Sequence, residues 1–290
     1  MRVLITGAGG HIGRRLTRLF SQSHRVTALG HPDLDVTDPQ AARDRVLIER
    51  PDLVINCSVL GVDACERQPA LAHAINAEAP GALARATAAA GARLLHFSSN
   101  YVFGGGRLEG PPYSEEDPPD PINTYGITKL EGERAVLAGG EHWLVRTSWV
   151  FGSGGKNLLS DVHRRLAAGE KVRAIQDTCA SATYLEDLAA RVLEIVELGR
   201  PGLYHVVNEE HCSYLEFARA AARIFRLGKE ADALIEPVLE ETFRTGAVRP
   251  RWTPMRCLAA ERVGLAPLRP WREALEAYIE SDIASSAATP

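Results

Sequence analysis

The chain has 290 residues, of which 45% are hydrophobic and 24% charged, a composition typical of a globular protein with one large core or two modest ones. Its formal net charge of -4 gives no basic footprint for nucleic acid, and no apolar run reaches the length of a membrane span. We therefore expect no nucleic-acid partner and no membrane partner, which leaves soluble enzymes and binding proteins as candidate classes.

Cysteine usage indicates a reducing compartment. The five cysteines are odd in number and widely spaced, without CxxC or Cys/His ligand spacing. The chain opens on a strand-like segment instead of a basic region followed by a long apolar one, so no secretory signal is indicated. We expect no disulfide framework, no metal site and a cytoplasmic location.

The first segments are a strand, a glycine turn and a helix. The apolar run at 3–6 meets Gly7, Gly10 and Gly13, and a helical pattern of apolar residues follows. Glycines let the backbone turn sharply and approach a pyrophosphate, which then lies at the helix N-terminus. The GxxGxxG spacing is weak evidence alone, but its place between a strand and a helix predicts dinucleotide binding.

The end of the second strand bears on the choice of cofactor. This strand, at 25–29, is followed by Gly30 and His31, where a site that prefers NAD usually has an acid. Arg14 and Arg15 could pair with a 2′-phosphate, although arginines on a helix are more often solvated. We therefore expect NADPH, with NADH as the alternative.

Strands and helices alternate through the first half. Further strands are predicted at 51–57, 93–98 and 143–149. An Ala-rich helix at 79–90 is ended by Gly91, and Asp38 is a candidate N-cap for an earlier helix, while Asp35 could face an adenine amino group. With right-handed crossovers, this alternation predicts an α/β fold with a doubly wound parallel sheet and helices on both faces.

The composition changes after the Gly-rich segment 152–155, where we place a soft domain boundary. We expect a dinucleotide-binding domain at 1–152, joined by parts of 170–240, and a smaller mixed α/β substrate-binding domain mainly at 153–290. Helices are expected near 157–168, 184–198, 213–226 and 270–280, and strands near 171–176 and 203–207.

The helix predicted after residue 123 carries a candidate proton-transfer pair. Tyr125 and Lys129 are four residues apart, so they share one face of a helix that Asn123 or Thr124 could cap. A phenol ionises near pH ~10, and a neighbouring cation lowers its pKa toward neutrality, which would make Tyr125 a usable acid and base. A surface helix that happens to carry Tyr and Lys is the alternative, and the YxxxK spacing alone favours it.

Ser99 follows the strand at 93–98, so it should lie at the carboxyl edge of the sheet, where a cofactor binds. It is a candidate for polarising a carbonyl group, and a capping serine is the alternative. The Tyr125 and Lys129 pair, which follows at a reasonable loop distance, favours the catalytic interpretation.

Several segments, in order along the chain, are similar to the motifs of one family. They are 7–13, 34–38, 62–66, 75–76, 98–103, 121–129, 146–150, 183–188, 204–205 and 249–250. Together they resemble the extended short-chain dehydrogenase/reductases, which have a Rossmann-type fold, and most closely the dTDP-4-dehydrorhamnose reductase family. The similarity runs nearly from end to end.

The resemblance implies an NAD(P)H-dependent reductase that acts on the 4-keto group of a nucleotide-linked, dTDP-type 4-keto-6-deoxy sugar. The reaction would belong to rhamnose or other deoxysugar biosynthesis, and the chain could form a homodimer. Hydride would pass to C4 while Tyr125 supplies the proton, Ser99 hydrogen-bonds the oxygen, and Lys129 binds the nicotinamide ribose and lowers the Tyr125 pKa. The implied cofactor contacts are Gly7, Gly10, His11, Ile12, Gly13, Arg14, Asp35, Val36, Cys57, Ser58, Tyr125 and Lys129. The implied substrate contacts are Val62, Asn100, Tyr101, Trp149 and Arg249.

The chain departs from the family pattern in four places, all in regions that the family uses for substrate. Asn100 stands where an acid is usual, and the segment 56–66 is one residue shorter. The usual Gly-x-Pro-Thr reads Ala-Ser-Ala-Thr at 180–183, and Arg-Trp-Thr-Pro-Met follows the Arg-Pro at 249–250, where a small polar residue and Leu are more usual. The reductase machinery is therefore better supported than the identity of the sugar.

Two alternatives belong to other classes. A non-catalytic regulatory subunit similar to the methionine adenosyltransferase β subunit would keep the fold, but it would have no need of all three groups Ser99, Tyr125 and Lys129. A nucleotide-sugar epimerase or dehydratase could use the same scaffold, although dehydratases typically place acidic residues after the catalytic hydroxyl, where this chain has Asn100 and Tyr101.

Overall fold

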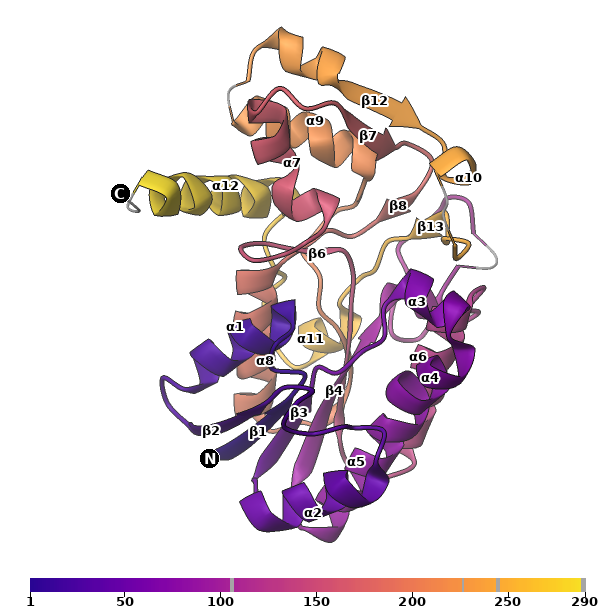
Figure 1. The fold of residues 1–290 in the computed structure, drawn as a ribbon, viewed down its shortest axis with the longest axis vertical. Helices are drawn as coiled ribbons and strands as arrows, with labels where there is room; N and C mark the ends of the chain where they lie inside the picture. Colours follow the sequence, from indigo (N-terminus) through magenta and orange to yellow (C-terminus); the bar gives the residue numbers. More distant parts are fainter. Residues whose placement is uncertain (105–106, 226, 244–245, 288–290) are drawn as a thin grey trace.

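The computed structural model describes residues 1–104, 107–225, 227–243 and 246–287. Its central element is a six-stranded sheet in the order β10-β5-β4-β3-β1-β2, in which neighbouring strands run parallel. Figure 1 labels β1, β2, β3 and β4 of this sheet. These strands are β1 (Arg2–Thr6), β2 (Arg25–Leu29), β3 (Leu53–Asn56), β4 (Arg93–Ser99), β5 (Trp143–Thr147) and β10 (Gly202–His205).

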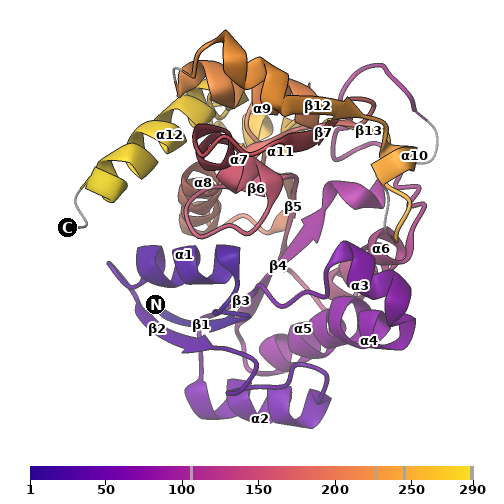
Figure 2. The same cartoon turned by 45° about the horizontal axis from the view of Figure 1, so that its top comes forward.

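Helices cover both faces of this sheet, as Figures 1 and 2 show. One face carries α1 (His11–Phe20) and α8 (Leu185–Leu198), and the other carries α2 (Pro39–Glu49), α5 (Ala79–Ala89) and α6 (Thr124–Leu137). Because side chains alternate along a strand, Ile5 and Ile55 pack under α1 and α8, whereas Leu4 and Val54 pack under α2 and α5. The Rossmann-type doubly wound sheet expected from the sequence is therefore confirmed.

The strand and helix predictions for the second half are close to the structure. They correspond to α7 (Leu158–Ala167), α8, α9 (Tyr214–Ile224), α12 (Trp271–Ala287), β7 (Val172–Ile175) and β10. Residue 226, at the end of one predicted helix, lies outside the described residues, and α12 continues beyond its predicted end at residue 280 to Ala287. Although α8 and β10 come from beyond residue 152, α8 packs on α1 and β10 pairs with β5.

The remaining elements are short. The strands are β6 (Val150–Phe151), β8 (Cys179–Ala180), β9 (Thr183–Tyr184), β11 (Cys212–Ser213), β12 (Ile235–Val238) and β13 (Trp252–Thr253). The helices are α3 (Val62–Arg67), α4 (Pro69–His73), α10 (Glu240–Phe243) and α11 (Leu258–Arg262). A short π-helix lies at Ala74–Glu78, and short 3-10 helices lie at Asn100–Val102 and Lys229–Leu234.

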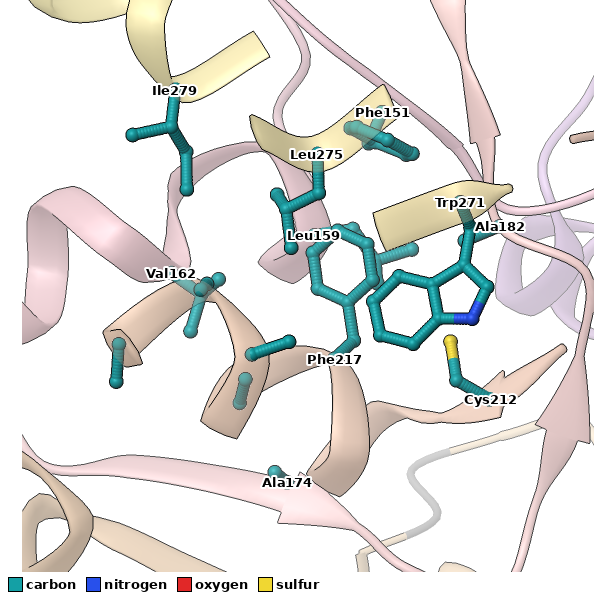
Figure 3. Close-up of a cluster of buried hydrophobic side chains, with 14 of the residues drawn as sticks. Phe151, Leu159, Val162, Ala174, Ala182, Cys212, Phe217, Trp271, Leu275 and Ile279 are labelled. Atoms are coloured by element: carbon teal, nitrogen blue, oxygen red, sulfur yellow. The ribbon is translucent and has the colours of Figure 1, made fainter. Parts of the chain in front are cut away.

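A second hydrophobic core lies away from the sheet, among α7, α9 and α12 (Figure 3). Phe217 of α9 stacks on Trp271 of α12, with ring centroids 5.5 Å apart, and Phe151 meets Phe217 edge-on. Leu275 and Val162 complete the contacts between α12 and α7 in the same cluster. Burial of these large side chains supplies the hydrophobic stabilisation that holds the short strands of this part in place.

A buried ion pair attaches α6 to the sheet. Arg146 of β5 donates from Nε and Nη2 to the two carboxylate oxygens of Glu133 at 2.8 and 2.7 Å. The two side chains are 4% and 3% exposed, and the Arg146 guanidinium lies over the Phe103 ring. Such a pair contributes little net stability over apolar residues, but loss of one partner leaves a buried charge uncompensated.

We predict that Glu133→Gln lowers the free energy of unfolding by about 3 kcal/mol, because Arg146 keeps its buried charge without a counter-charge. On the same helix, Glu131 forms a partly exposed pair with His73, so Glu131→Gln should change it by less than about 0.5 kcal/mol. Denaturant unfolding of both variants checks this difference, and equal losses would contradict it.

Candidate active site

A crevice opens where β1 and β3 end. The chain leaves β1 toward β2 on one side and later returns to β3 on the other side, so the ends of these two strands form the switch point of the sheet. The crevice has a volume of about 350 Å³. It is lined by Gly7, Gly9, Gly10, Gly30, His31, Leu34, Asp35, Val36, Cys57, Ser58, Val59 and Ile75.

The glycine turn brings the start of α1 against this crevice. Gly7 has a φ of +64°, and a Cβ on it would lie 2.6 Å from the backbone of Cys57 and Ser58, so only glycine fits there. Gly10 is the N-cap of α1 and provides no side-chain cap. The first N–H groups of the helix are therefore left for a ligand, and the helix dipole favours a negative charge there.

A second cavity, of about 400 Å³, adjoins the crevice, since Cys57, Ser58 and Val59 line both. Its walls also include His11, Ile12, Val62, Phe97, Ser98, Ser99, Asn100, Tyr101, Tyr125, Lys129, Thr147, Ser148, Trp149, Val150, Asn157 and Tyr214. We call the crevice and this cavity together the cleft. The structure thus brings Ser99, Tyr125 and Lys129 to one wall of the cleft.

Two contacts fix the start of α6, which carries Tyr125. Asn123 caps the helix by accepting from the N–H of Gly126 at 2.8 Å, as the sequence suggested. Glu66 of α3 accepts from both the backbone N–H and the hydroxyl of Thr124, at 2.9 and 3.0 Å. The first turn of α6 is therefore held from inside the helix and from α3.

Gly126 allows α6 to lie against the end of β4. A Cβ at Gly126 would lie 2.1 Å from the carbonyl oxygen of Tyr101, closer than any side chain allows. The Tyr101 ring consequently meets the Tyr125 ring edge-on, with centroids 5.5 Å apart. This close approach sets the position of Tyr125 relative to Ser99.

The Tyr125 phenol is held in its protonated form. Burial raises the pKa of Tyr125 to about 12, and its contact with the Ser99 hydroxyl only partly offsets that rise. We expected a net lowering toward neutrality by Lys129, and this expectation is wrong for the structure, because desolvation outweighs every favourable interaction of the phenolate. Tyr125 is therefore arranged as a proton donor.

Lys129 is a buried part of the cavity wall. Its Nζ donates to the carbonyl oxygen of Phe97 at 2.5 Å and lies 3.2 Å from Nε2 of His96. Burial lowers the pKa of Lys129 to about 8, against the opposing charge of Glu133. Burial and the Lys129 charge together lower the pKa of His96 well below its usual value, so this ring is neutral.

An aromatic stack forms another part of the cavity wall. Trp149 has a φ of +41°, a strained conformation for a bulky residue, and its ring stacks on Tyr214 with centroids 3.9 Å apart. Strain of this kind persists only where the surroundings hold it, and here the Trp149 carbonyl oxygen accepts from the N–H of Thr183. The pair presents a flat apolar surface to the cavity.

Comparison with known proteins identifies the family. The family model described as the RmlD substrate binding domain matches residues 1–283. A dTDP-4-dehydrorhamnose reductase of Mycolicibacterium smegmatis is 38% identical over 294 residues, covering 100% of this chain and 88% of that protein. A dTDP-4-keto-6-deoxy-D-glucose reductase of Streptomyces niveus is 32% identical, covering 94% of this chain and 95% of that one. The chain belongs to the dTDP-4-dehydrorhamnose reductase family.

Solved structures agree with this assignment. A dTDP-4-dehydrorhamnose reductase from Bacillus anthracis, crystallised in complex with NADP, superposes with a TM-score of 0.90 at 31% identity, covering 97% of this chain and 99% of that chain. A UDP-glucose 4-epimerase from Thermotoga maritima superposes at 0.82 with 19% identity, which shows a shared fold alone. The resemblance inferred from the sequence motifs is confirmed.

Arg14 and Arg15, the two arginines expected to pair with a 2′-phosphate, are engaged elsewhere in the structure. Arg15 pairs with Glu186, and Arg14 donates to the carbonyl oxygens of Gly9 and Gly154, so neither arginine lines the cleft. His31 is the one residue with a basic side chain among the described residues that line the crevice.

Arg249, expected to contact the substrate, also lies outside the lining of the cleft. Its guanidinium pairs with Asp63 of α3, with Nη2 2.9 Å from Oδ2. The Arg249 charge nevertheless reaches the cavity wall, because it opposes the burial that raises the pKa of Tyr101 and of Tyr214.

Several residues of the cavity wall escaped prediction. Tyr214 begins α9 and carries no local signal of a binding role. Ser98, Thr147 and Ser148 also line the cavity, although their hydroxyl oxygens are buried and have no hydrogen-bond partner among the described residues. Their position at the carboxyl ends of β4 and β5 is the signal that could have identified them.

No group of three or more His, Cys, Asp or Glu side chains in the part of the chain that the structure describes is arranged to hold a metal ion. None of the helices that the structure describes has the length and apolar character that a membrane span needs.

We predict that kcat/KM falls as pH rises through about 8, where Lys129 loses its charge. Below that pH Lys129 carries its positive charge and the enzyme is active, and above it the charge is lost. In Lys129→Arg the falling limb should move to higher pH, since a guanidinium stays charged. Lys171→Arg, an exposed control, should leave it in place. A limb that stays near the same pH in Lys129→Arg would assign the ionisation to another group.

Proposed function

We propose that this chain catalyses the NADPH-dependent reduction of the 4-keto group of a dTDP-linked 4-keto-6-deoxy sugar. The observation that supports this most is the cleft itself, in which Ser99, Tyr125 and Lys129 stand on one wall of a cavity that adjoins the glycine-turn crevice. The names of the family members noted above support the same class of substrate.

The crevice fits a dinucleotide. A Cβ at Gly9 would meet no protein atom within 4 Å, and the Gly10 cap leaves the first N–H groups of α1 open, so a pyrophosphate can approach the backbone. Residues that would hold the cofactor are Gly7, Gly10, His11, Ile12, Gly13, Arg14, Asp35, Val36, Cys57, Ser58, Tyr125 and Lys129. When bound, the cofactor supplies the hydride.

The choice of NADPH is supported by the end of β2. Gly30 and His31 line the crevice there, and neither carries the negative charge that would repel a 2′-phosphate. The His31 ring can donate a hydrogen bond to that phosphate. Arg14 donates to the carbonyl oxygen of Gly9 in the glycine turn, next to the lining of the crevice, so we assign it to the pyrophosphate side of the cofactor and not to the 2′-phosphate.

The residues of the chain supply the proton. Because the Tyr125 pKa is about 12, its hydroxyl is protonated at neutral pH and can donate to the alkoxide that develops at C4. Ser99 stabilises the same oxygen by a hydrogen bond. Lys129, which titrates near pH 8, supplies positive charge at the site and a donor for the nicotinamide ribose.

The substrate would lie between the sheet and the aromatic wall. Trp149 and Tyr214 provide the apolar surface against the sugar, with Val62, Asn100 and Tyr101 on the facing wall. Arg249, which pairs with Asp63 and interacts electrostatically with Tyr101 and Tyr214, is the candidate partner of the diphosphate. In this assignment residues 1–152, with α8 and β10, bind the cofactor, and residues 153–290 mainly bind the substrate.

We predict that Tyr125→Phe lowers kcat about 10³-fold, because no other group at the site replaces its proton, while NADPH affinity changes less than about threefold. The control is Tyr204→Phe, which removes a hydroxyl bonded to the Arg200 carbonyl outside the cleft. Steady-state kinetics and NADPH fluorescence titration measure both effects. Near-normal turnover by Tyr125→Phe would contradict the proposed mechanism.

A further inference from the structure

A chain of hydrogen bonds connects the catalytic edge of the sheet with a distant strand. Ser99 Oγ donates to Asn100 Oδ1 at 3.1 Å, and Asn100 Nδ2 donates to Oγ1 of Thr253 on β13 at 2.7 Å. Asn100 and Thr253 are each 2% exposed. Thr253 lines neither part of the cleft.

The Thr253 hydroxyl anchors the Asn100 amide at the end away from Ser99. An amide has a donor end and an acceptor end, and both ends here face hydroxyl groups, which can donate or accept. With its donor end bound to Thr253, the amide presents its oxygen to Ser99, and Ser99 must donate its proton to that oxygen. Among the hydrogen bonds of the described residues, Thr253 is the partner of Asn100 Nδ2, so without its hydroxyl this end of the amide loses its anchor.

Thr253 is itself held firmly by its neighbours. It pairs with Ala180 of β8, and the Cys179 N–H donates to the carbonyl oxygen of Arg251 at 2.7 Å. Past the strand, the Met255 N–H donates to the hydroxyl of Ser181 at 3.1 Å. The position of the Thr253 hydroxyl is thus set by backbone contacts that do not involve Asn100.

We propose that Thr253 is a positioning residue for the ketoreduction, which acts through Asn100 to hold the Ser99 hydroxyl in place beside Tyr125. This inference rests on the proposed function. The Tyr101 N–H donates to Ser99 Oγ at 3.2 Å, so the hydroxyl is restrained both as an acceptor and as a donor. Asn100 Oδ1 belongs to a neutral amide and is a weaker acceptor than a developing alkoxide. The Ser99 proton therefore turns from Asn100 to the substrate oxygen as negative charge develops there.

Thr253→Val tests the proposal, because it removes the hydroxyl at nearly constant volume. We expect kcat to fall about tenfold, with KM for the sugar nucleotide and Kd for NADPH changed less than about threefold. Thr253→Ser, which restores the hydroxyl, should recover most of kcat. The matched control is Thr178→Val beside β8, whose buried hydroxyl has no partner among the described residues, and it should keep the wild-type kcat. Equal kcat values for Thr253→Val and Thr178→Val would overturn the proposal.

A double-mutant cycle tests the route through Asn100. If Thr253 acts through that amide, Thr253→Val should cause no further loss of kcat in an Asn100→Ala background. A full tenfold loss in that background would show that Thr253 acts by another route and would overturn the proposal.

The wild-type assay separates this inference from the function on which it rests. Failure of the wild-type protein to reduce any dTDP-linked 4-keto-6-deoxy sugar contradicts the proposed function. A crystal structure of Thr253→Val then decides the positioning role without turnover. A changed rotamer of Ser99 or Asn100 supports it, whereas an unchanged Ser99–Asn100 contact overturns it.

Discussion

The close approach of α6 to the end of β4 is the constraint on which the site depends. It requires the absence of a side chain at Gly126, where a Cβ would lie 2.1 Å from the Tyr101 carbonyl oxygen. From that contact follow the position of Tyr125 near Ser99 and the path of Lys129 toward Phe97. The buried Arg146–Glu133 pair holds the same helix farther along, so α6 is fixed to the sheet at two levels. A catalytic helix fixed in this way keeps its side chains in a productive arrangement before any ligand arrives.

Desolvation gives the two titratable groups of α6 complementary properties. It raises the pKa of Tyr125 to about 12 and lowers the pKa of Lys129 to about 8. The phenol therefore keeps its proton, and the ammonium is near its point of titration. Both effects favour a site in which a proton is delivered to an oxygen that becomes negative during the reaction. A Tyr125 phenolate that removes a proton at neutral pH does not match this arrangement, because the Tyr125 pKa is about 12.

Much of this architecture follows from local sequence, and the remainder depends on contacts across the chain. The glycine turn, the Asp38 and Asn123 caps and the alternation of strands and helices have local causes, and the structure has them where the sequence predicts them. The i,i+4 spacing placed Tyr125 and Lys129 on one face but could not reveal their burial, which reverses the expected pKa shift. Arg15 pairs with Glu186, which lies 171 residues away in the sequence, so no local pattern could reveal this ion pair.

The C-terminal part of the site was the hardest to foresee. Tyr214 and Thr253 come next to Trp149 and Asn100 only through the packing of short strands and α9, for which no local pattern exists. Asn100, first seen as a missing charge, has a role in the structure that a neutral amide performs, because it joins two hydroxyl groups. The departure from the usual acid is thus accommodated by the hydroxyl of Thr253.

The most direct measurement of the central claim is the fate of the hydride. NADPH deuterated at C4 of the nicotinamide would be incubated with the protein and a dTDP-linked 4-keto-6-deoxy sugar, and the product analysed by mass spectrometry and NMR. The account predicts oxidation of the cofactor and a single deuterium at C4 of the sugar. Deuterium elsewhere in the product, or a cofactor that is bound but never consumed, would contradict it.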